Sequence, residues 1–230
     1  MNPERELQVI AAEVSTCRKC PRLVEYREKV AREKRRAFRE WTYWGRGVPG
    51  FGDPRAKLFI LGLAPAAHGG NRTGRVFTGD RSGDFLFQAL HEAGFANQTT
   101  SINREDGLQL RNAYIAAAVR CAPPANKPLP GETQNCREYL RRELAILKPK
   151  AILALGKIAW DAYLDLLRAD GKIISRAPYI FGHGAECVMP GGERLVGVYH
   201  PSQQNTQTGR LTPVMYRKVL QRIRTVLGSS

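Results

Sequence analysis

The sequence predicts an α/β fold, a three-layer α/β/α arrangement around a four-stranded parallel sheet. Four apolar runs are continuous rather than alternating, as expected for strands that are buried on both faces of a sheet. Segments with the period of a helix separate these runs, which is typical of parallel strands joined by covering helices. The expected strands are residues 57–63, 112–120, 150–155 and 194–199.

Helical patterns cover much of the remaining chain. The 230 residues, 43% of them hydrophobic, suffice for one domain over 1–230, in which residues 1–56 form an N-terminal helical segment and a glycine- and proline-broken loop. Residues 171–192 have no clear pattern. The expected helices are residues 4–16, a basic and mostly solvated helix over 22–40, and 82–93, 132–147, 157–168 and 214–227.

The chain is strongly basic, with 36 Lys and Arg against 21 acidic residues and a net charge of +15. Such an excess is typical of a polyanion partner, because each neutralised phosphate releases counterions. A basic surface that only keeps the protein soluble is the alternative. No apolar run reaches the roughly 18 residues of a membrane span, and the N-terminus lacks the order of a secretory signal. We therefore expect a cytoplasmic monomer with no membrane partner.

Each expected strand ends in an unusual segment. The first runs into "GLAPAAHGGNRTGRVFTGD", Gly62 to Asp80, which contains five glycines. The others end in Cys121-Ala122-Pro123-Pro124, in Gly156 and in His200-Pro201-Ser202. Because the carboxyl ends of parallel strands meet at one edge of the sheet, where ligands bind, we expect these segments to come together there.

The cysteines suggest a metal site rather than disulfides, because the expected compartment is reducing. Cys17 and Cys20 form a C-x2-C pair before the sheet, Cys121 ends a strand and Cys136 follows within a helix. Four thiolates can hold zinc or an iron–sulfur cluster, and the wide second spacing favours the bulkier cluster. Cys187 is interpreted as an ordinary buried residue.

The motifs "GLAPAAHGGNRTGRVFTGD" and "HPSQQN", together with the four cysteines, resemble the uracil-DNA glycosylase superfamily. The similarity is greatest to its family 5 branch (type b), which carries an iron–sulfur cluster, and extends from about Cys17 to Leu220. It implies a four-stranded parallel sheet between helices and removal of damaged bases from double- and single-stranded DNA. It also implies a structural [4Fe-4S] cluster on Cys17, Cys20, Cys121 and Cys136.

The chain departs from the superfamily pattern at three places. Many members position the attacking water with an aspartate or asparagine where this chain has Ala64, and a related iron–sulfur branch has a glutamate at the position of Leu63. The asparagine that contacts the edge of uracil in many members is missing, since Ala116-Ala117-Ala118 occupies that region. These departures favour the family 5 branch and leave the water-positioning and base-contacting groups open.

A glycosylase that acts on duplex DNA must flip the base into a pocket. Gly62 and the pair Gly69-Gly70 allow close approach of the backbone to that base. Phe77 is the expected stacking platform, and base–aromatic stacking contributes about 1–3 kcal/mol; a core position under the loop is the alternative. The expected substrate-binding residues are Gly62, Ala64, Pro65, His68, Phe77 and Ser202.

His200 is the expected electrophile, because an imidazole N–H at a base carbonyl stabilises the charge of the departing base. Asn71 and Asn126 are the preferred residues for orienting the water. His68, Asp80 and Asp84 are the other candidates for this role. Asp80 is explained at least as well as the cap of the following helix.

Contacts with DNA are expected from basic residues and from the loop after His200. Arg210 or Leu211 is the expected wedge that fills the vacated stack. Ser202 is expected to contact a phosphate through its hydroxyl and backbone N–H. Further phosphate contacts are expected from Arg72, Arg75, Lys127 and the segment 32–39.

The sequence therefore predicts a monofunctional DNA glycosylase for base excision repair, which releases uracil and other deaminated bases such as hypoxanthine. A non-catalytic, cluster-containing nucleic-acid-binding module is the main alternative. A nucleotide-binding enzyme of Rossmann type is less consistent with the sequence, because the glycines after the first strand do not give G-x-G-x-x-G.

Overall fold

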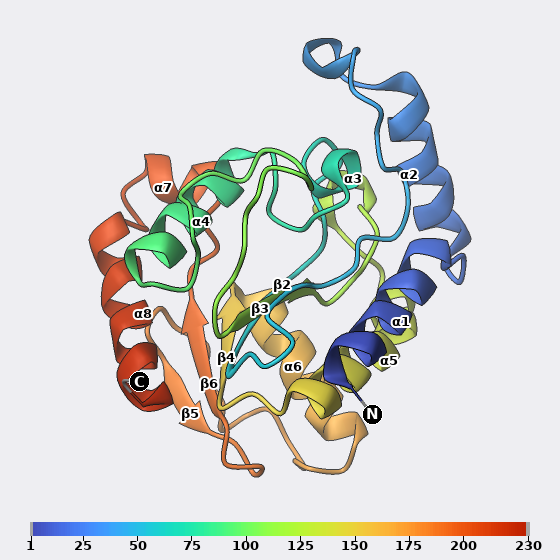
Figure 1. Cartoon of the computed structure of the whole chain (residues 1–230). Helices are drawn as coiled ribbons and strands as arrows, with labels where there is room; N and C mark the ends of the chain where they lie inside the picture. The colour runs from blue at the N-terminus through green and yellow to red at the C-terminus, as the bar shows by residue number, and fades with distance from the viewer. Residues whose placement is uncertain (1, 229–230) are drawn as a thin grey trace.

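The computed structural model describes residues 2–228, which form one sheet with helices on both faces (Figure 1). Its strand order is β1-β3-β2-β4-β6-β5, and the four central strands are parallel, as predicted. The sheet has six strands rather than four, because β1 and β5 add antiparallel edges. The strands are β1 (Phe51–Gly52), β2 (Leu58–Gly62), β3 (Ala113–Ala117), β4 (Ala151–Leu155), β5 (Glu186–Val188) and β6 (Arg194–Val198).

The longer helices match the predicted ones except near the N-terminus, and the short helices α3 and α7 were not predicted. The helix expected over 22–40 ends at Glu33, because Lys34 has a φ of 53° and cannot continue it. The α-helices are α1 (Pro3–Thr16), α2 (Pro21–Glu33), α3 (Gly70–Thr73), α4 (Arg81–Glu92), α5 (Pro130–Leu147), α6 (Lys157–Ala169), α7 (Gln203–Gln207) and α8 (Pro213–Leu227). Short 3-10 turns, η1 (Arg36–Phe38) and η2 (Pro124–Asn126), complete the helical segments.

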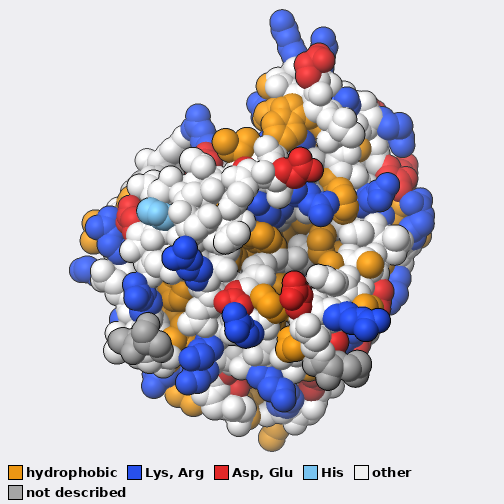
Figure 2. All heavy atoms as spheres, in the orientation of Figure 1, with side chains coloured by type: hydrophobic (Ala, Val, Ile, Leu, Met, Phe, Trp, Pro, Cys, Tyr) orange, Lys and Arg blue, Asp and Glu red, His pale blue; other side chains and the backbone are white. Residues whose placement is uncertain are grey.

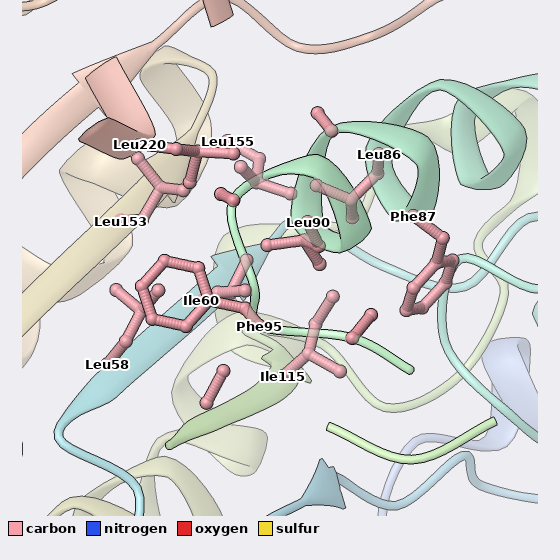
Figure 3. Packing of buried hydrophobic residues seen from close by; sticks show 14 of the residues in the cluster. Leu58, Ile60, Leu86, Phe87, Leu90, Phe95, Ile115, Leu153, Leu155 and Leu220 are labelled. Atoms are coloured by element: carbon pink, nitrogen blue, oxygen red, sulfur yellow. The ribbon is translucent and has the colours of Figure 1, made fainter. Parts of the chain in front are cut away.

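The two faces of the sheet bury two separate apolar layers. Side chains alternate along a strand, so Leu58 and Ile60 of β2 pack with α4 and α8 (Figure 3). Phe59 and Leu61 of the same strand pack on the other face with α5 and α6. All residues of β2, β3 and β4 are buried, which explains why these strands appear as unbroken apolar runs in the sequence.

Three loops gather at the carboxyl edge of the parallel strands. The backbone N–H groups of Ala118 and Val119, after β3, donate to the carbonyls of Gly62, the last residue of β2, and Leu63, at 2.9 Å each. The loop after β6 begins with Tyr199 and leads into α7. Within residues 2–228, no helix combines the length and the apolar character that crossing a bilayer requires.

Candidate active site and cysteine site

Gly62, Phe77 and His200 meet at the carboxyl edge of the sheet. The ring centroids of Phe77 and His200 lie 5.8 Å apart. A Cβ on Gly62 would come within 2.6 Å of the Phe77 ring, so the ring packs directly over the end of β2. Phe77 has a φ of 51°, a backbone conformation that is uncommon for a residue with a Cβ and is often found at functional sites. The predicted meeting of the first loop with His200 is therefore confirmed.

The contact between the two rings limits where a base can lie. Because Phe77 and His200 touch, a base cannot insert between them in this conformation. Phe77 is only half-buried, so a base can stack on a part of its ring that the protein leaves uncovered.

His200 is held by its backbone, and its ring remains available. Its carbonyl accepts hydrogen bonds from Ser202 N at 2.8 Å and from Asn205 Nδ2 at 2.9 Å. Its Cβ lies near Gly156 at the end of β4, where an added Cβ would be 3.3 Å away. Within residues 2–228 the imidazole nitrogens form no hydrogen bond. Burial lowers the pKa of His200, so the imidazole is neutral at pH 7 and can donate one N–H.

Asn71 lies inside the first loop rather than on its surface. The residue is fully buried, and its Nδ2 donates to the carbonyls of Arg27 at 3.2 Å and Ala67 at 3.4 Å. Its Oδ1 is buried without a partner among the described residues. In this position Asn71 joins the loop to α2, which does not favour the predicted contact with an attacking water.

The structure does not support phosphate contacts by Arg72 and Arg75, because both are buried. Arg72 Nε donates to His68 O at 2.8 Å and its Nη2 to Gly79 O at 2.9 Å. Arg75 donates to Thr78 and Ser101, and its Nη2 forms an ion pair with Asp106 at 2.6 Å. Both guanidinium groups hold the loop in shape. The sequence could not distinguish these buried arginines from solvated ones.

His68 also has a partner in the protein. Its Nδ1 lies 3.1 Å from the hydroxyl of Tyr43. Burial lowers the pKa of His68, and the charges of Arg35 and Arg72 lower it further. His68 is half-buried on the same loop as Phe77, so its predicted place near the substrate remains a prediction.

Asp80 and Asn126 are less enclosed than Asn71, since Asp80 is half-buried and Asn126 is exposed. Asp80 caps α4, as the sequence allowed, since its Oδ1 accepts from Gly83 N at 2.9 Å. Its other oxygen faces Gly69, and burial raises the pKa of the carboxyl. Asn126 is exposed, and both it and Ala125 have positive φ angles, of 56° and 53°. Two consecutive left-handed residues with a Cβ represent strain that often accompanies function.

The three residues predicted to contact DNA in the loop after His200 lie in different environments. Ser202 caps α7, its hydroxyl accepting from Asn205 N at 3.3 Å. Leu211 is 1% exposed and belongs to the core, so it is not available as a wedge in this conformation. Arg210 is exposed, with its guanidinium 4.8 Å from the centre of the Tyr199 ring.

The start of the first loop connects the two sites. Pro65 is buried and packs against Gly70, where an added Cβ would be 3.0 Å from the proline Cβ. Ala64 is half-buried and packs against a group that contains three of the cysteines. The methyl group of Ala64 therefore packs beside the cysteines, and no carboxylate stands at this position.

The four predicted cysteines gather beside α2 and α5. Cys20, Cys121 and Cys136 share one buried cluster, and Cys17 packs against the adjoining one. Burial raises the pKa of Cys136 to about 12, and the nearby thiols contribute to this shift. Burial also raises the pKa of Cys121, to which Cys17 and Cys20 add. All four cysteines are free, and Cys187 lies on the edge strand β5.

Several N–H groups point at these sulfurs. Arg27 Nη1 donates to Cys121 Sγ at 2.9 Å, Asn135 Nδ2 to Cys20 Sγ at 3.3 Å and the backbone N of Arg120 to Cys136 Sγ at 3.5 Å. Arg27 is buried, its Nε has no partner, and within residues 2–228 no carboxylate forms an ion pair with it. A buried cation of this kind requires a counter-charge, which thiolates around a metal would supply.

The donor set fits an iron–sulfur cluster, because four thiolates can hold one and N–H groups are directed at three of these sulfurs. N–H groups directed at the sulfurs are also typical of cluster sites.

Arg27, Phe38 and Trp41 support the two sites, a role that the sequence did not predict. Arg27 lies on the apolar face of α2 with Leu23 and Val24. A cation among apolar residues at helical spacing is the feature of the sequence that could have indicated a buried, functional arginine. Phe38 and Trp41 contact the buried Arg72, whose guanidinium carbon lies 3.9 and 4.0 Å from their ring centres. Nothing in the sequence pattern indicated this partner, because Phe38 and Trp41 are about thirty residues from Arg72 in the chain.

Comparisons with known proteins agree with the resemblance. The family model described as "Uracil DNA glycosylase superfamily" matches residues 49–224. A "Type-5 uracil-DNA glycosylase" of Mycobacterium tuberculosis is 51% identical over 217 residues, which cover 94% of this chain and 80% of that protein. The protein of the same name from Thermus thermophilus is 48% identical, covering 99% and 100%. A "Type-4 uracil-DNA glycosylase" of Thermotoga maritima is 31% identical, covering 67% and 69%.

Proposed function

Because the chain belongs to the uracil-DNA glycosylase superfamily, on its type-5 branch, we propose that it hydrolyses the N-glycosidic bond of uracil in DNA and acts in base excision repair. The observation that carries this proposal is the meeting of Phe77 with Gly62 and His200 at the carboxyl edge of the sheet. This arrangement offers a stacking surface and a neutral N–H donor at the same point.

In the proposed reaction the flipped base stacks on the uncovered part of the Phe77 ring, and His200 donates a hydrogen bond to a carbonyl oxygen of the base. The C–N bond breaks with its electron pair going to the base, which leaves an oxocarbenium-like sugar. Stabilising the departing anion lowers the barrier because the imidazole is already oriented and partly desolvated. Water then adds to the sugar and loses a proton, giving an abasic site.

For the water we propose Asn126 and Asp80 in place of Asn71. The Asn126 side chain is exposed, whereas Asn71 is committed to Arg27 and Ala67. Burial raises the pKa of the Asp80 carboxyl, which makes it a better proton acceptor than an ordinary aspartate. An asparagine can orient water without accepting its proton, and an oxocarbenium ion needs little further activation.

We propose that the enzyme tolerates several deaminated bases, including hypoxanthine. Ala116 and Ala117 end β3, Ala118 follows, and all three are buried in the apolar layers, so this segment supplies no polar side chain that would select uracil. A site without such a group gains no hydrogen bond with uracil but also excludes fewer bases. Rates of release from U:G, U:A and hypoxanthine:T duplexes test this, and strict uracil specificity would contradict it.

We propose that Cys17, Cys20, Cys121 and Cys136 hold a [4Fe-4S] cluster. When bound, the cluster cross-links α1, α2, α5 and the end of β3, and its role is structural. Arg27 contributes positive charge beside the thiolates. The visible absorbance of the purified protein, with its iron and sulfide content, distinguishes a cluster from zinc.

Contact with DNA involves the loop after His200. We propose that Arg210, exposed beside Tyr199, is the wedge that fills the vacated stack, since Leu211 belongs to the core. The substrate is damaged DNA, either double- or single-stranded.

A strand-cleavage assay tests the activity. Labelled duplex with a single uracil is incubated with the protein, and half of each sample is treated with alkali. Breaks that require alkali indicate a monofunctional glycosylase, whereas breaks without alkali would indicate lyase chemistry. DNA binding without either product would favour the non-catalytic module.

A further inference from the structure

Residues 32–42, called the basic arm here, project from the body of the protein beyond α2 (Figure 1). Figure 2 shows Lys and Arg side chains on this projecting tip. The arm has two acidic residues, Glu33 and Glu40, and all of its cations except Lys34 are exposed. Its cations are Arg32, Lys34, Arg35, Arg36 and Arg39.

The charge of the arm is not neutralised within the protein. Glu33 pairs with Lys29 on the preceding turn, at 3.8 Å. Among the described residues, Arg35, Arg36 and Arg39 form no ion pair. Surface cations that lack partners and stand clear of the body repel one another, so the arrangement favours an extended polyanion with which they can pair.

The arm is fixed at its base, which a merely solvated loop does not require. The guanidinium of Arg72 lies against the rings of Phe38 and Trp41, at 3.9 and 4.0 Å from their centres. These rings also contact each other edge to face, with centroids 6.4 Å apart. Cation–π contacts of a desolvated guanidinium are among the stronger ones, so the arm has a defined position.

The same arginine links the arm to the candidate active site. Arg72 donates to the carbonyls of His68 and Gly79, the second of which precedes Asp80. A second connection runs through Tyr43, whose hydroxyl lies 3.1 Å from His68 Nδ1 and accepts from Arg35 N at 3.4 Å. A displacement of the arm would therefore move both ends of the loop that carries Phe77.

We propose that the basic arm binds the phosphate backbone of duplex DNA flanking the damaged nucleotide and that this contact positions the loop 68–80 through Arg72. The inference rests on the proposed glycosylase function and adds a second, remote DNA contact to it. Arginine suits this role because its planar guanidinium pairs well with phosphate oxygens.

A charge-neutralised arm tests the binding step. The triple variant Arg35→Gln/Arg36→Gln/Arg39→Gln is compared with Lys148→Gln/Lys150→Gln/Lys172→Gln. The control removes the same charge from exposed lysines at the opposite, amino-terminal edge of the sheet, where they form no described ion pair. Affinity for a long duplex with an abasic-site analogue is measured over a range of salt concentrations.

The arm variant is expected to bind DNA about tenfold or more weakly at low salt. The slope of log K against log salt concentration is expected to become shallower by roughly two to three, since each phosphate contact contributes about −0.9. The control is expected to retain the slope of the native protein. Equal slopes for arm variant and native protein, or an equal loss in both triple variants, would overturn the proposal.

A second variant tests the link to the loop. Trp41→Leu removes an aromatic partner of Arg72 and leaves the charges of the arm unchanged. It is expected to slow base release in single-turnover experiments more than it weakens DNA binding, and Trp41→Phe is expected to restore much of the rate. Unchanged base release in a folded Trp41→Leu protein, judged by its melting temperature, would refute the coupling.

The two proposals fail in different ways. If the native protein releases no base but the arm variant still loses salt-dependent DNA binding, the glycosylase proposal is wrong and the arm contact stands. If the native protein is an active glycosylase, and the arm variant binds DNA and releases base at the same levels as the native protein, the arm proposal alone is wrong.

Discussion

The cysteine site and the His200 site lie at the same edge of the sheet but are built in opposite ways. At the cysteine site three of four sulfurs are buried, and Arg27, Asn135 and a backbone N–H point at them. At the His200 site the imidazole nitrogens have no partner among residues 2–228, and Arg210, which lies beside Tyr199, is exposed. The first arrangement is closed and suits a structural role, whereas the second leaves groups free for a ligand.

The closed region extends into a fully buried ion pair. Arg120 and Glu143 form two hydrogen bonds, one of them 3.0 Å long, and Tyr114 donates to the same carboxylate at 3.3 Å. Arg120 directly precedes Cys121, so its ion pair with Glu143 helps to hold the backbone that carries this cysteine. The comparison predicts that changes here affect stability, whereas changes at the open site affect turnover.

The largest effect is expected from Glu143→Gln, which leaves Arg120 buried without a counter-charge. Loss of one partner of a buried pair costs about 3–5 kcal/mol, so the free energy of unfolding should fall by that amount in a denaturant titration. Glu138→Gln is the control, because Glu138 is exposed and its pairing with Arg141 contributes less than about 1 kcal/mol. Equal effects of the two changes would remove the distinction between closed and open regions.

The next effect is expected from His200→Ala at the open site. Removal of one preorganised donor costs about 10²–10³ in turnover, and DNA affinity should change little because the imidazole acts on the departing base. Single-turnover base release and binding to an abasic duplex measure the two quantities. His91→Ala, at an exposed position of α4, is the matched control. A parallel loss of binding and turnover would mean that His200 serves the structure instead.

A smaller effect is expected from Gly62→Ala. The new Cβ would come within 2.6 Å of the Phe77 ring, and overpacking of this kind costs about 1–3 kcal/mol. Base release should slow because Phe77 must move, and Phe77→Leu in the same chain should relieve the strain. Gly131→Ala has no atom within 4 Å of its added Cβ and should leave the melting temperature unchanged or raise it. A normal rate in Gly62→Ala would argue against stacking on Phe77.

The smallest effect concerns pH. Burial lowers the pKa of His200 below its ordinary 6.5, so the neutral imidazole persists as the pH falls past that value. Base release should therefore remain level through pH 6.5 and decline only in more acid solution. The free energy of unfolding should also fall as the solution becomes more acid than pH 6.5, because His200 of the unfolded chain then binds a proton that the folded chain excludes. A rate that rises with acid near pH 6.5 would indicate that the protonated form is active.

The sequence predicted the parts of the protein that have a periodic pattern or a distinctive residue type. The four central strands, most helices, the four gathered cysteines and the meeting of His200 with the glycine-rich loop were all expected. The edge strands β1 and β5 were not, because two and three residues are too few for a period to be visible. The helix break at Lys34 depends on a single positive φ, which is uncommon for a residue with a Cβ and which a lysine in the sequence does not indicate.

By itself, the sequence determined the order of strands and helices and the residue types at the strand ends, because burial on both faces of a sheet requires continuous apolar runs. Only the tertiary structure decided which polar residues are available. Arg72, Arg75 and Asn71 are buried and Asn126 and Arg210 exposed, although all five are polar residues in loops or short helical segments. The physical reason is that burial of a polar group depends on partners distant in sequence, such as Phe38 for Arg72 and Asp106 for Arg75, and these partners are set by the fold.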